Sequence, residues 1–221
     1  MVDLSTKKAE FKELKTTIDT RAIWDETERV HTQLVKNTFA TQFEPFEQWV
    51  DTAIDVIKRG NKIILFGNGG SATDSQHIAT EMAVKLYKER SPIAAMSLAL
   101  DASAITACAN DYGFSEVFSR QIRTLGYEGD MAIGLSTSGN SENVLKGLKK
   151  AKRMGMITVG LTGENGGKMP PICDILIKVP DPYPGLIQEM HITLGHMFVS
   201  VLEQKLGLVW IWVWVKITLE L

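Results

Sequence analysis

The stretch NKIILFGNGGSATD, residues 61–74, decides the fold. Its apolar run 63–66 predicts a buried strand, the glycines predict a tight turn, and the residues from Ser71 onward predict a helix. The first N–H groups of a helix have no intrahelical partner and the helix dipole is positive there, so the turn suits an anion such as phosphate. It is not a Walker loop, because no Gly-Lys-Ser/Thr follows the turn. It is not a dinucleotide fingerprint either, because its glycine spacing differs from G-x-G-x-x-G. On its own, it is equally typical of a purely structural turn.

The rest of the chain alternates apolar strand patterns with helical patterns. This alternation predicts an α/β fold, with a doubly wound five-stranded parallel sheet flanked by helices. Ligands of such folds bind beyond the carboxyl ends of the strands. The later strands are expected at 93–100, 131–135, 157–161 and 175–179, and the helices at 71–87, 103–109, 115–125, 141–154 and 188–205, with a break at 110–114.

The two ends of the chain differ from this α/β unit, which we expect to span residues 61–206. Residues 1–60 predict an N-terminal helical arm of the same domain, which either forms an oligomer interface or covers one edge of the sheet. Residues 207–221 form an atypical tail with tryptophans at alternate positions. The tail is strand-like and too short to span a bilayer as a helix. It could add to a sheet edge, pack on a partner subunit or be a reading-frame artefact, so no function is assigned to it.

Composition limits the class of protein. The 221 residues carry a formal net charge of −2 without long basic runs, which favours neither a nucleic-acid partner nor a membrane surface. Cys108 and Cys173 lack metal-ligand spacing and indicate no disulfide framework, so a reducing cytoplasm is the expected location. The N-terminus does not resemble a signal peptide, and no run of about 18 apolar residues predicts a membrane span.

A second loop has the same placement as the first, between a strand and a helix. The segment STSGNS, residues 136–141, follows an expected strand and precedes an expected helix. Ser141 occupies the N-cap position, so its hydroxyl could simply cap that helix. Four hydroxyls exceed what one cap requires, and hydroxyls with helix N–H groups can hold a phosphate monoester. Two such loops at one sheet edge favour a phosphosugar ligand.

Two pairs of side chains are candidates for chemistry. His77 and Glu81 are four residues apart and share one helical face, so one cation could contact both, although such a pair is more often a solvated ion pair. Gln188 and His196 are eight residues apart, about 12 Å along a helix. Both could reach one ion only if Gln188 reaches in from the helix start. His191 would point away from His196 and is expected to be structural.

The segments GNGGSATDSQH, NDYGF, STSGNS and IQEMH together resemble the sugar isomerase (SIS) family, whose fold is flavodoxin-like. The resemblance spans roughly residues 20–206. Within the family it is strongest to bacterial members that interconvert sedoheptulose 7-phosphate and D-glycero-D-manno-heptose 7-phosphate. It implies an aldose–ketose isomerase with one Zn²⁺ per subunit bound by His77, Glu81, Gln188 and His196.

The resemblance also implies roles in substrate binding and catalysis. Glu81 would be the base of an enediol-type proton transfer and His196 the complementary acid or base. The implied assembly is a homotetramer, and the implied pathway is heptose nucleotide synthesis for cell-surface polysaccharide, including lipopolysaccharide. The implied substrate-binding residues are Asn68, Gly69, Gly70, Ser71, Glu81, Asn110, Asp111, Ser136, Thr137, Ser138, Ser141 and Gln188.

Two residues differ from the family pattern, and two other functions remain as alternatives. Lys85 stands where the family has Arg, and Gly185 stands where it has Asp, so the sugar could differ from the usual heptulose. One rival is a non-catalytic SIS adaptor that binds the replication initiator; it lacks the equivalents of Glu81 and His196, which this chain retains. The other is a sugar-phosphate-sensing regulatory domain, which no helix-turn-helix or basic DNA-binding surface supports.

Overall fold

The computed structural model describes residues 18–209, so the tail from residue 210 and the helical pattern expected before residue 18 lie outside the described part. The described chain alternates helices and strands in the expected order. The elements are α1 (Thr20–Thr41), α2 (Phe43–Lys58), β1 (Ile63–Gly67), α3 (Gly70–Ala83), β2 (Ala95–Ser97), α4 (Ala102–Tyr112), the 3₁₀ turn η2 (Phe114–Glu116), α5 (Val117–Leu125), β3 (Met131–Leu135), α6 (Glu142–Arg153), β4 (Ile157–Gly163), β5 (Ile175–Val179) and α7 (Pro184–Lys205).

The sheet has five parallel strands, as predicted, and their order is β2-β1-β3-β4-β5. From β1 the chain moves to one side to form β2 and then returns to the other side for β3. The strand order therefore reverses at β1, and Gly67 at the end of β1 pairs with Leu135 at the end of β3. In open α/β sheets, a crevice opens at the carboxyl ends of the two strands at such a switch point.

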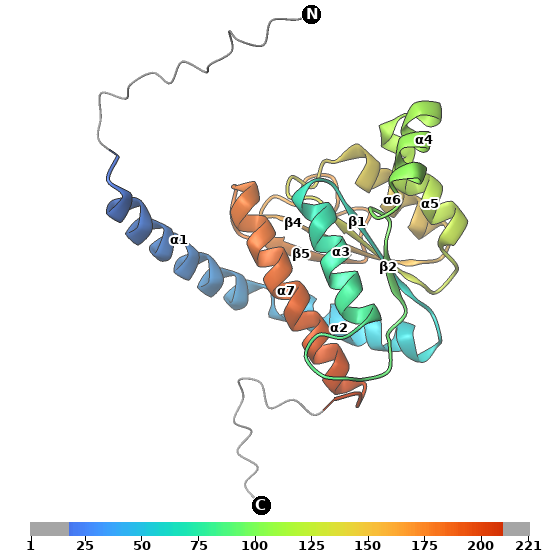
Figure 1. Cartoon of the computed structure of the whole chain (residues 1–221), viewed down its shortest axis with the longest axis horizontal. Helices are drawn as coiled ribbons and strands as arrows, with labels where there is room; N and C mark the ends of the chain where they lie inside the picture. Colours follow the sequence, from blue (N-terminus) through green and yellow to red (C-terminus); the bar gives the residue numbers. More distant parts are fainter. Residues whose placement is uncertain (1–17, 210–221) are drawn as a thin grey trace, which may run out of the picture.

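Helices cover both faces of the sheet (Figure 1). The core on one face joins the strands to α2, α3 and α7, and the core on the other joins them to α5 and α6. Trp49 of α2 stacks on Phe198 of α7 with ring centroids 3.9 Å apart. Strands β1 and β3 are buried along their whole length, as is typical of strands in a two-faced parallel sheet. The two strands that carry the candidate loops are thus held rigidly.

Three helix ends differ from the sequence-based expectation. Helix α3 ends at Ala83 rather than near residue 87, and an irregular segment leads to a short β2. Helix α4 continues through the NDY residues and stops at Gly113, whose φ of +89° ends it. Helix α7 begins at Pro184, since proline suits the first turn of a helix. Gln188 therefore lies inside α7 rather than at its start.

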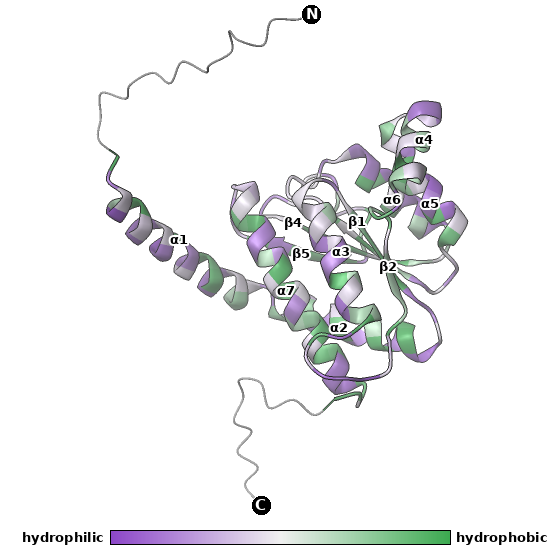
Figure 2. Cartoon of the chain, viewed as in Figure 1, coloured by the Kyte–Doolittle hydropathy of each residue, from purple (hydrophilic) through white to green (hydrophobic). Residues whose placement is uncertain are grey.

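Helix α1 projects from the α/β body (Figure 1). Among its residues only Leu34 and Thr38 are buried. Apolar side chains elsewhere on it are exposed, and Figure 2 shows hydrophobic residues along its free length. Most of α1 is exposed and covers no part of the sheet, whereas α2, the second helix of the arm, packs on one face of it. None of the described helices combines the length and apolar character required to cross a membrane.

Candidate active site

The first Gly-rich loop lies between β1 and α3. Gly69 has a φ of +55°, and it provides no side chain to cap α3, so the first N–H groups of that helix receive no side-chain cap bond. A Cβ on Gly70 would lie 2.6 Å from Oε1 of Gln188. The loop is therefore shaped by close approach of α7, and the amide of Gln188 lies against the start of α3.

The serine loop, residues 136–141, follows β3, the strand that pairs with β1. The Ser136 hydroxyl donates to Oγ of Ser141 at 2.9 Å. Ser141 is the N-cap residue of α6, but its side chain makes no capping bond. The interpretation of Ser141 as a side-chain cap is therefore wrong, because its hydroxyl bonds Ser136 instead of the first N–H groups of α6.

Residues 163–168, a glycine-rich segment that begins at the end of β4, pack against the backbone of the serine loop. A Cβ on Gly139, whose φ is +64°, would lie 2.2 Å from the carbonyl oxygen of Gly166. The N–H of Lys168 donates to the carbonyl of Gly139 at 2.9 Å, and that of Gly163 to the carbonyl of Thr137 at 2.9 Å. Backbone thus packs on backbone, which only glycine permits at residue 139.

Asn143 joins the two loops and was missed in the sequence. The amides of Asn68 and Asn143 bond reciprocally, each Nδ2 donating to the other Oδ1 at 2.8 Å. Asn143 Oδ1 also accepts from the N–H of Val144. Asn143 is 3% exposed, so it orients Asn68 from inside the protein. An asparagine in the first turn of a helix carries no sequence signal for such a role.

His77, Glu81 and His196 converge on one point. Glu81 Oε1 lies 3.0 Å from Nε2 of His77 and 3.2 Å from Nε2 of His196, and the two nitrogens are 3.3 Å apart. Helix α3 supplies the first two side chains and α7 supplies the third. The pairing is thus more than a local ion pair on one helix, because a residue 119 positions away completes it.

The donor set suits a metal ion. Two imidazole nitrogens and a carboxylate oxygen are common Zn²⁺ ligands, and tetrahedral bonds of about 2.0–2.1 Å would separate them by about 3.3–3.4 Å. The three observed separations of 3.0, 3.2 and 3.3 Å are close to that edge. Glu81 Oε2 is buried without a hydrogen-bond partner in the described structure, which leaves a carboxylate oxygen for a further interaction. The residues present therefore fit the ion.

Gln188 stands apart from this triad. Its amide contacts Gly70, seven residues before His77 on α3, and about 12 Å of helix rise separates it from His196 on α7. Its assignment as a fourth metal ligand stays a prediction.

Asp74 is a second residue that sequence reasoning missed. It lies three residues before His77 on α3, a spacing that places both on one helical face and could have identified it. Its Oδ2 is buried without a hydrogen-bond partner among the described residues. Burial raises the pKa of this carboxyl to about 6, although the nearby His77 acts in the opposite direction. Asp74 thus adds a carboxyl that can exchange a proton near neutral pH.

Other predicted residues lie elsewhere. Asn110 and Asp111 are exposed near the end of α4, where the Asn110 amide donates to Asp111 Oδ1 at 2.8 Å. Lys85 lies beyond the end of α3 and pairs with the exposed Glu89. At Gly185, an added Cβ would meet open space. Neither departure from the family pattern therefore disturbs the triad.

The two remaining histidines have structural contacts. His191 is buried, and its Nε2 donates to the carbonyl of Thr162 at 3.3 Å. Burial lowers its pKa to about 4, so it is neutral in the folded protein at pH 7. His31 of α1 pairs with Glu189 of α7, which is next to Gln188 in the chain. The expectation that His191 is structural agrees with these contacts.

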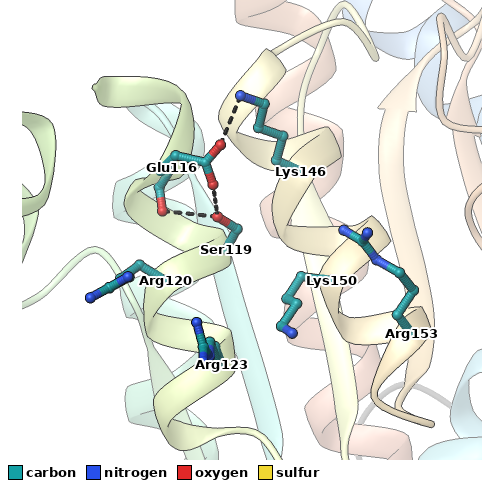
Figure 3. Close-up of a pocket in the computed structure, with 7 residues that line it drawn as sticks. All are labelled: Glu116, Ser119, Arg120, Arg123, Lys146, Lys150 and Arg153. Atoms are coloured by element: carbon teal, nitrogen blue, oxygen red, sulfur yellow. Dashed lines mark hydrogen bonds and ion pairs between the residues drawn. The ribbon is translucent and has the colours of Figure 1, made fainter. Parts of the chain in front are cut away.

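A second concave region lies between α5 and α6 (Figure 3). It has a volume of about 320 Å³ and is lined by one acidic and five basic residues. Lys146 is already paired with Glu116 and Glu142. This region has no group of three metal-binding side chains, because the one such group in the described chain is His77, Glu81 and His196. We therefore assign the candidate active site to the triad on α3 and α7 together with the loops that follow β1 and β3.

Comparisons with known proteins show the family to which the chain belongs. A family model described as SIS domain matches residues 28–163. A phosphoheptose isomerase of Aneurinibacillus thermoaerophilus is 50% identical over 158 residues, covering 72% of this chain and 80% of that protein. One of Aquifex aeolicus is 50% identical over 161 residues, covering 72% and 84%.

A solved structure agrees as well. The phosphoheptose isomerase GmhA from Neisseria gonorrhoeae superposes with a TM-score of 0.79 at 36% identity, covering 84% of this chain and all of that one. The chain belongs to the SIS domain family, in the branch that contains the phosphoheptose isomerases.

Proposed function

We propose that the protein is a phosphoheptose isomerase, which interconverts sedoheptulose 7-phosphate and D-glycero-D-manno-heptose 7-phosphate. One observation carries the proposal: Glu81 holds one carboxylate oxygen between two imidazoles and keeps the other buried and unpaired. The relatives of this chain are named phosphoheptose isomerases. A non-catalytic adaptor would have no need for this triad.

The substrate phosphate binds at the serine loop, where Ser136, Thr137, Ser138 and Ser141 and the start of α6 provide hydroxyl and N–H donors. The hydroxyls of the sugar contact residues 68–71 and the amide of Gln188. Asn110 and Asp111, near the end of α4, stay predicted substrate contacts. This arrangement directs the carbonyl end of the sugar towards the triad.

The reaction moves protons and leaves the carbon chain intact. A base removes a proton from C1 of the ketose, which produces an enediol-type intermediate across C1 and C2. Return of a proton to C2 and transfer of the hydroxyl proton from O1 to O2 yield the aldose. Glu81 is the base, and His196 is the complementary acid or base that exchanges the oxygen-bound proton.

His77, Glu81 and His196 would hold one Zn²⁺ per subunit, with Gln188 as the candidate fourth ligand. When bound, the ion would polarise the substrate oxygens and stabilise negative charge on them. The proposed assembly is a homotetramer in which the apolar surface of α1 is covered by other subunits. The aldose phosphate would feed heptose nucleotide synthesis for surface polysaccharide, including lipopolysaccharide, in the cytoplasm.

Turnover of sedoheptulose 7-phosphate by the purified protein tests this proposal. The rate is measured as purified, after chelation, and after Zn²⁺ is restored. We expect isomerisation that chelation abolishes and Zn²⁺ restores. Binding of the phosphosugar without turnover would indicate another sugar, for which Lys85 and Gly185 are the first positions to examine. The absence of both phosphosugar binding and turnover would contradict the proposal.

A further inference from the structure

A fully buried ion pair lies at the end of α3, next to Glu81 of the triad. The side chains of Arg90 and Glu203 are both 0% exposed, and Arg90 Nε donates to Glu203 Oε1 at 2.7 Å. A buried ion pair is often no more stabilising than well-packed apolar side chains, because both charges lose their hydration. Its presence therefore calls for a reason besides stability.

The remaining donors of Arg90 hold the end of α3. One terminal nitrogen donates to the carbonyl of Glu81 at 2.6 Å, and the other donates to the carbonyl of Met82 at 2.7 Å. The second nitrogen also contacts the carbonyls of Val84 and Ser91. The last carbonyls of a helix have no intrahelical partners, and the dipole there favours a cation. Arg90 therefore binds the backbone of Glu81 itself.

Glu203 connects this cap to the other helix of the triad. It lies on α7, seven residues after His196, which is about two turns along the same face. Its Oε1 also accepts from the N–H of Leu86, in the segment that follows α3. The ion pair thus ties the end of α3 to α7 on the side where α7 presents His196.

The two helices touch directly at the level of the triad. A Cβ on Gly195 would lie 2.5 Å from Cδ1 of Ile78. Gly195 precedes His196 and Ile78 follows His77, so the backbone separation at this contact sets the separation of the two imidazoles. Apolar contact alone leaves helices free to slide by fractions of an ångström, whereas a forked guanidinium with several acceptors permits little movement.

We propose that Arg90 and Glu203 are positioning residues that fix α3 against α7, so that His77, Glu81 and His196 meet at one metal ion. The inference deepens the proposed function and rests on it for the metal. Functional groups need placement within about half an ångström, and residues that support metal ligands commonly change metal affinity by about 10–100-fold when replaced. Arg90 and Glu203 touch neither the metal ligands' side chains nor the predicted substrate loops.

The test measures metal binding without turnover. Metal-free wild type, Arg90→Lys and Glu203→Gln are titrated with Co²⁺, and binding is followed by visible absorption at a temperature where circular dichroism shows each protein folded. Lysine keeps the charge but loses the fork, and glutamine keeps the shape but loses the charge. We expect Co²⁺ to bind at least about tenfold more weakly to both variants than to the wild type.

The Lys62–Asp130 pair provides a matched control. Its Nζ–Oδ2 distance is 2.6 Å, and the Asp130 side chain is 2% exposed. Asp130 immediately precedes β3, and neither residue of the pair lies on α3 or α7, so the pair does not join the two helices that carry the triad. Asp130→Asn should lower the melting temperature yet leave Co²⁺ affinity within about twofold of wild type. This result separates positioning from general stability.

Two results would overturn the inference: wild-type Co²⁺ affinity in the folded variants, or no Co²⁺ binding by the wild type. If Arg90→Lys does not fold, Glu203→Gln decides alone, and Glu203→Asp, which retains both charges, should recover part of the affinity. A wild type that binds Co²⁺ but does not isomerise sedoheptulose 7-phosphate would contradict the proposed function and leave the positioning role intact. The two failures are therefore distinguishable.

Discussion

Glu81 meets two requirements that oppose each other in a single carboxylate. A metal ligand must give up a lone pair to the ion, whereas a general base needs an oxygen free to accept a proton. In this structure Oε1 faces both imidazoles, and Oε2 is buried without a partner among the described residues. Asp74, a half-buried carboxyl one turn before His77 on α3, adds a second proton-exchanging group.

Replacing Glu81 with Gln tests the base. Glutamine has nearly the same shape and still offers an oxygen to the imidazoles, so the fold and phosphosugar binding should persist. We expect turnover to fall by about 100-fold or more, because general-base catalysis contributes about 10²–10⁴. The matched control is Glu89→Gln, since Glu89 is exposed and pairs only with Lys85 among the described residues. Unchanged turnover of Glu81→Gln would remove Glu81 from the mechanism.

Replacing Asp74 with Asn tests its environment through the pH dependence of stability. The pKa of this carboxyl is raised to about 6 by burial, so the folded state holds the proton more tightly than the unfolded chain does. Stability therefore falls as pH rises from about 4 to about 6, and the whole cost is present above pH 6. Asn carries no charge and avoids that cost.

The measurement is urea unfolding of the metal-free protein at pH 4.5 and pH 7.5. We expect Asp74→Asn to be more stable than wild type by about 1–3 kcal/mol at pH 7.5 and by much less at pH 4.5. Protonation of His191 in the unfolded chain affects both proteins equally and cancels in the difference. An equal difference at the two pH values would mean that Asp74 has an ordinary pKa.

At the scale of elements, the site depends on how two loops and two helices are held. Asn143 ties the Gly-rich loop to the start of α6, and Gly139 lets the serine loop rest on Gly166. Each contact joins segments that are distant in sequence. The loops are therefore positioned by side-chain amides and backbone contacts rather than by their own conformational preferences.

Replacing Asn143 with Ala should loosen the first loop. The reciprocal amide bonds to Asn68 are lost, and the half-buried amide of Asn68 loses its partners. We expect the KM for the phosphosugar to rise about tenfold, a change of about 1.4 kcal/mol, with a smaller effect on kcat. Steady-state kinetics measure both, and Asn165→Ala, an exposed change in a neighbouring loop, is the control. A fall in kcat alone would contradict the loop-positioning role.

At the scale of the whole molecule, α1 is the least supported helix. It is joined to α7 through His31 and Glu189 and through the packing of Leu34 on Ile187 and Met190. Trp24 is 70% exposed and Phe39 is 46% exposed. Apolar surface of this extent on a projecting helix is typical of a subunit interface. The arm also reaches α7 beside Gln188, so assembly and site are adjacent.

Deleting residues 1–40 should therefore reduce the assembly. We expect the wild type to have the mass of a tetramer in light scattering coupled to size-exclusion chromatography, and the truncated protein to have a smaller mass. Phe39→Glu should weaken the assembly in the same direction, whereas Lys36→Glu, on an exposed polar position of the same helix, should not. An intact tetramer after the deletion would contradict the role of the arm.

The sequence by itself determined the fold and most of the candidate site. Strands β3 and β5 have the predicted bounds, because short apolar runs between turn signals read clearly. The pairing of His77 with Glu81 followed from the period of one helix, and both loops followed from glycine and serine at strand ends. These features are local, and local periodicity is what a sequence records directly.

Only the tertiary structure decided the contacts between distant segments. It brought His196 to Glu81, placed Gln188 against Gly70, paired Asn68 with Asn143, and buried Arg90 against Glu203. Each depends on the separation and rotation of packed elements, which no spacing along the chain encodes. The sequence therefore indicated which residues carry the chemistry. Their relative positions arise from the packing of α3 on α7 and of β1 beside β3.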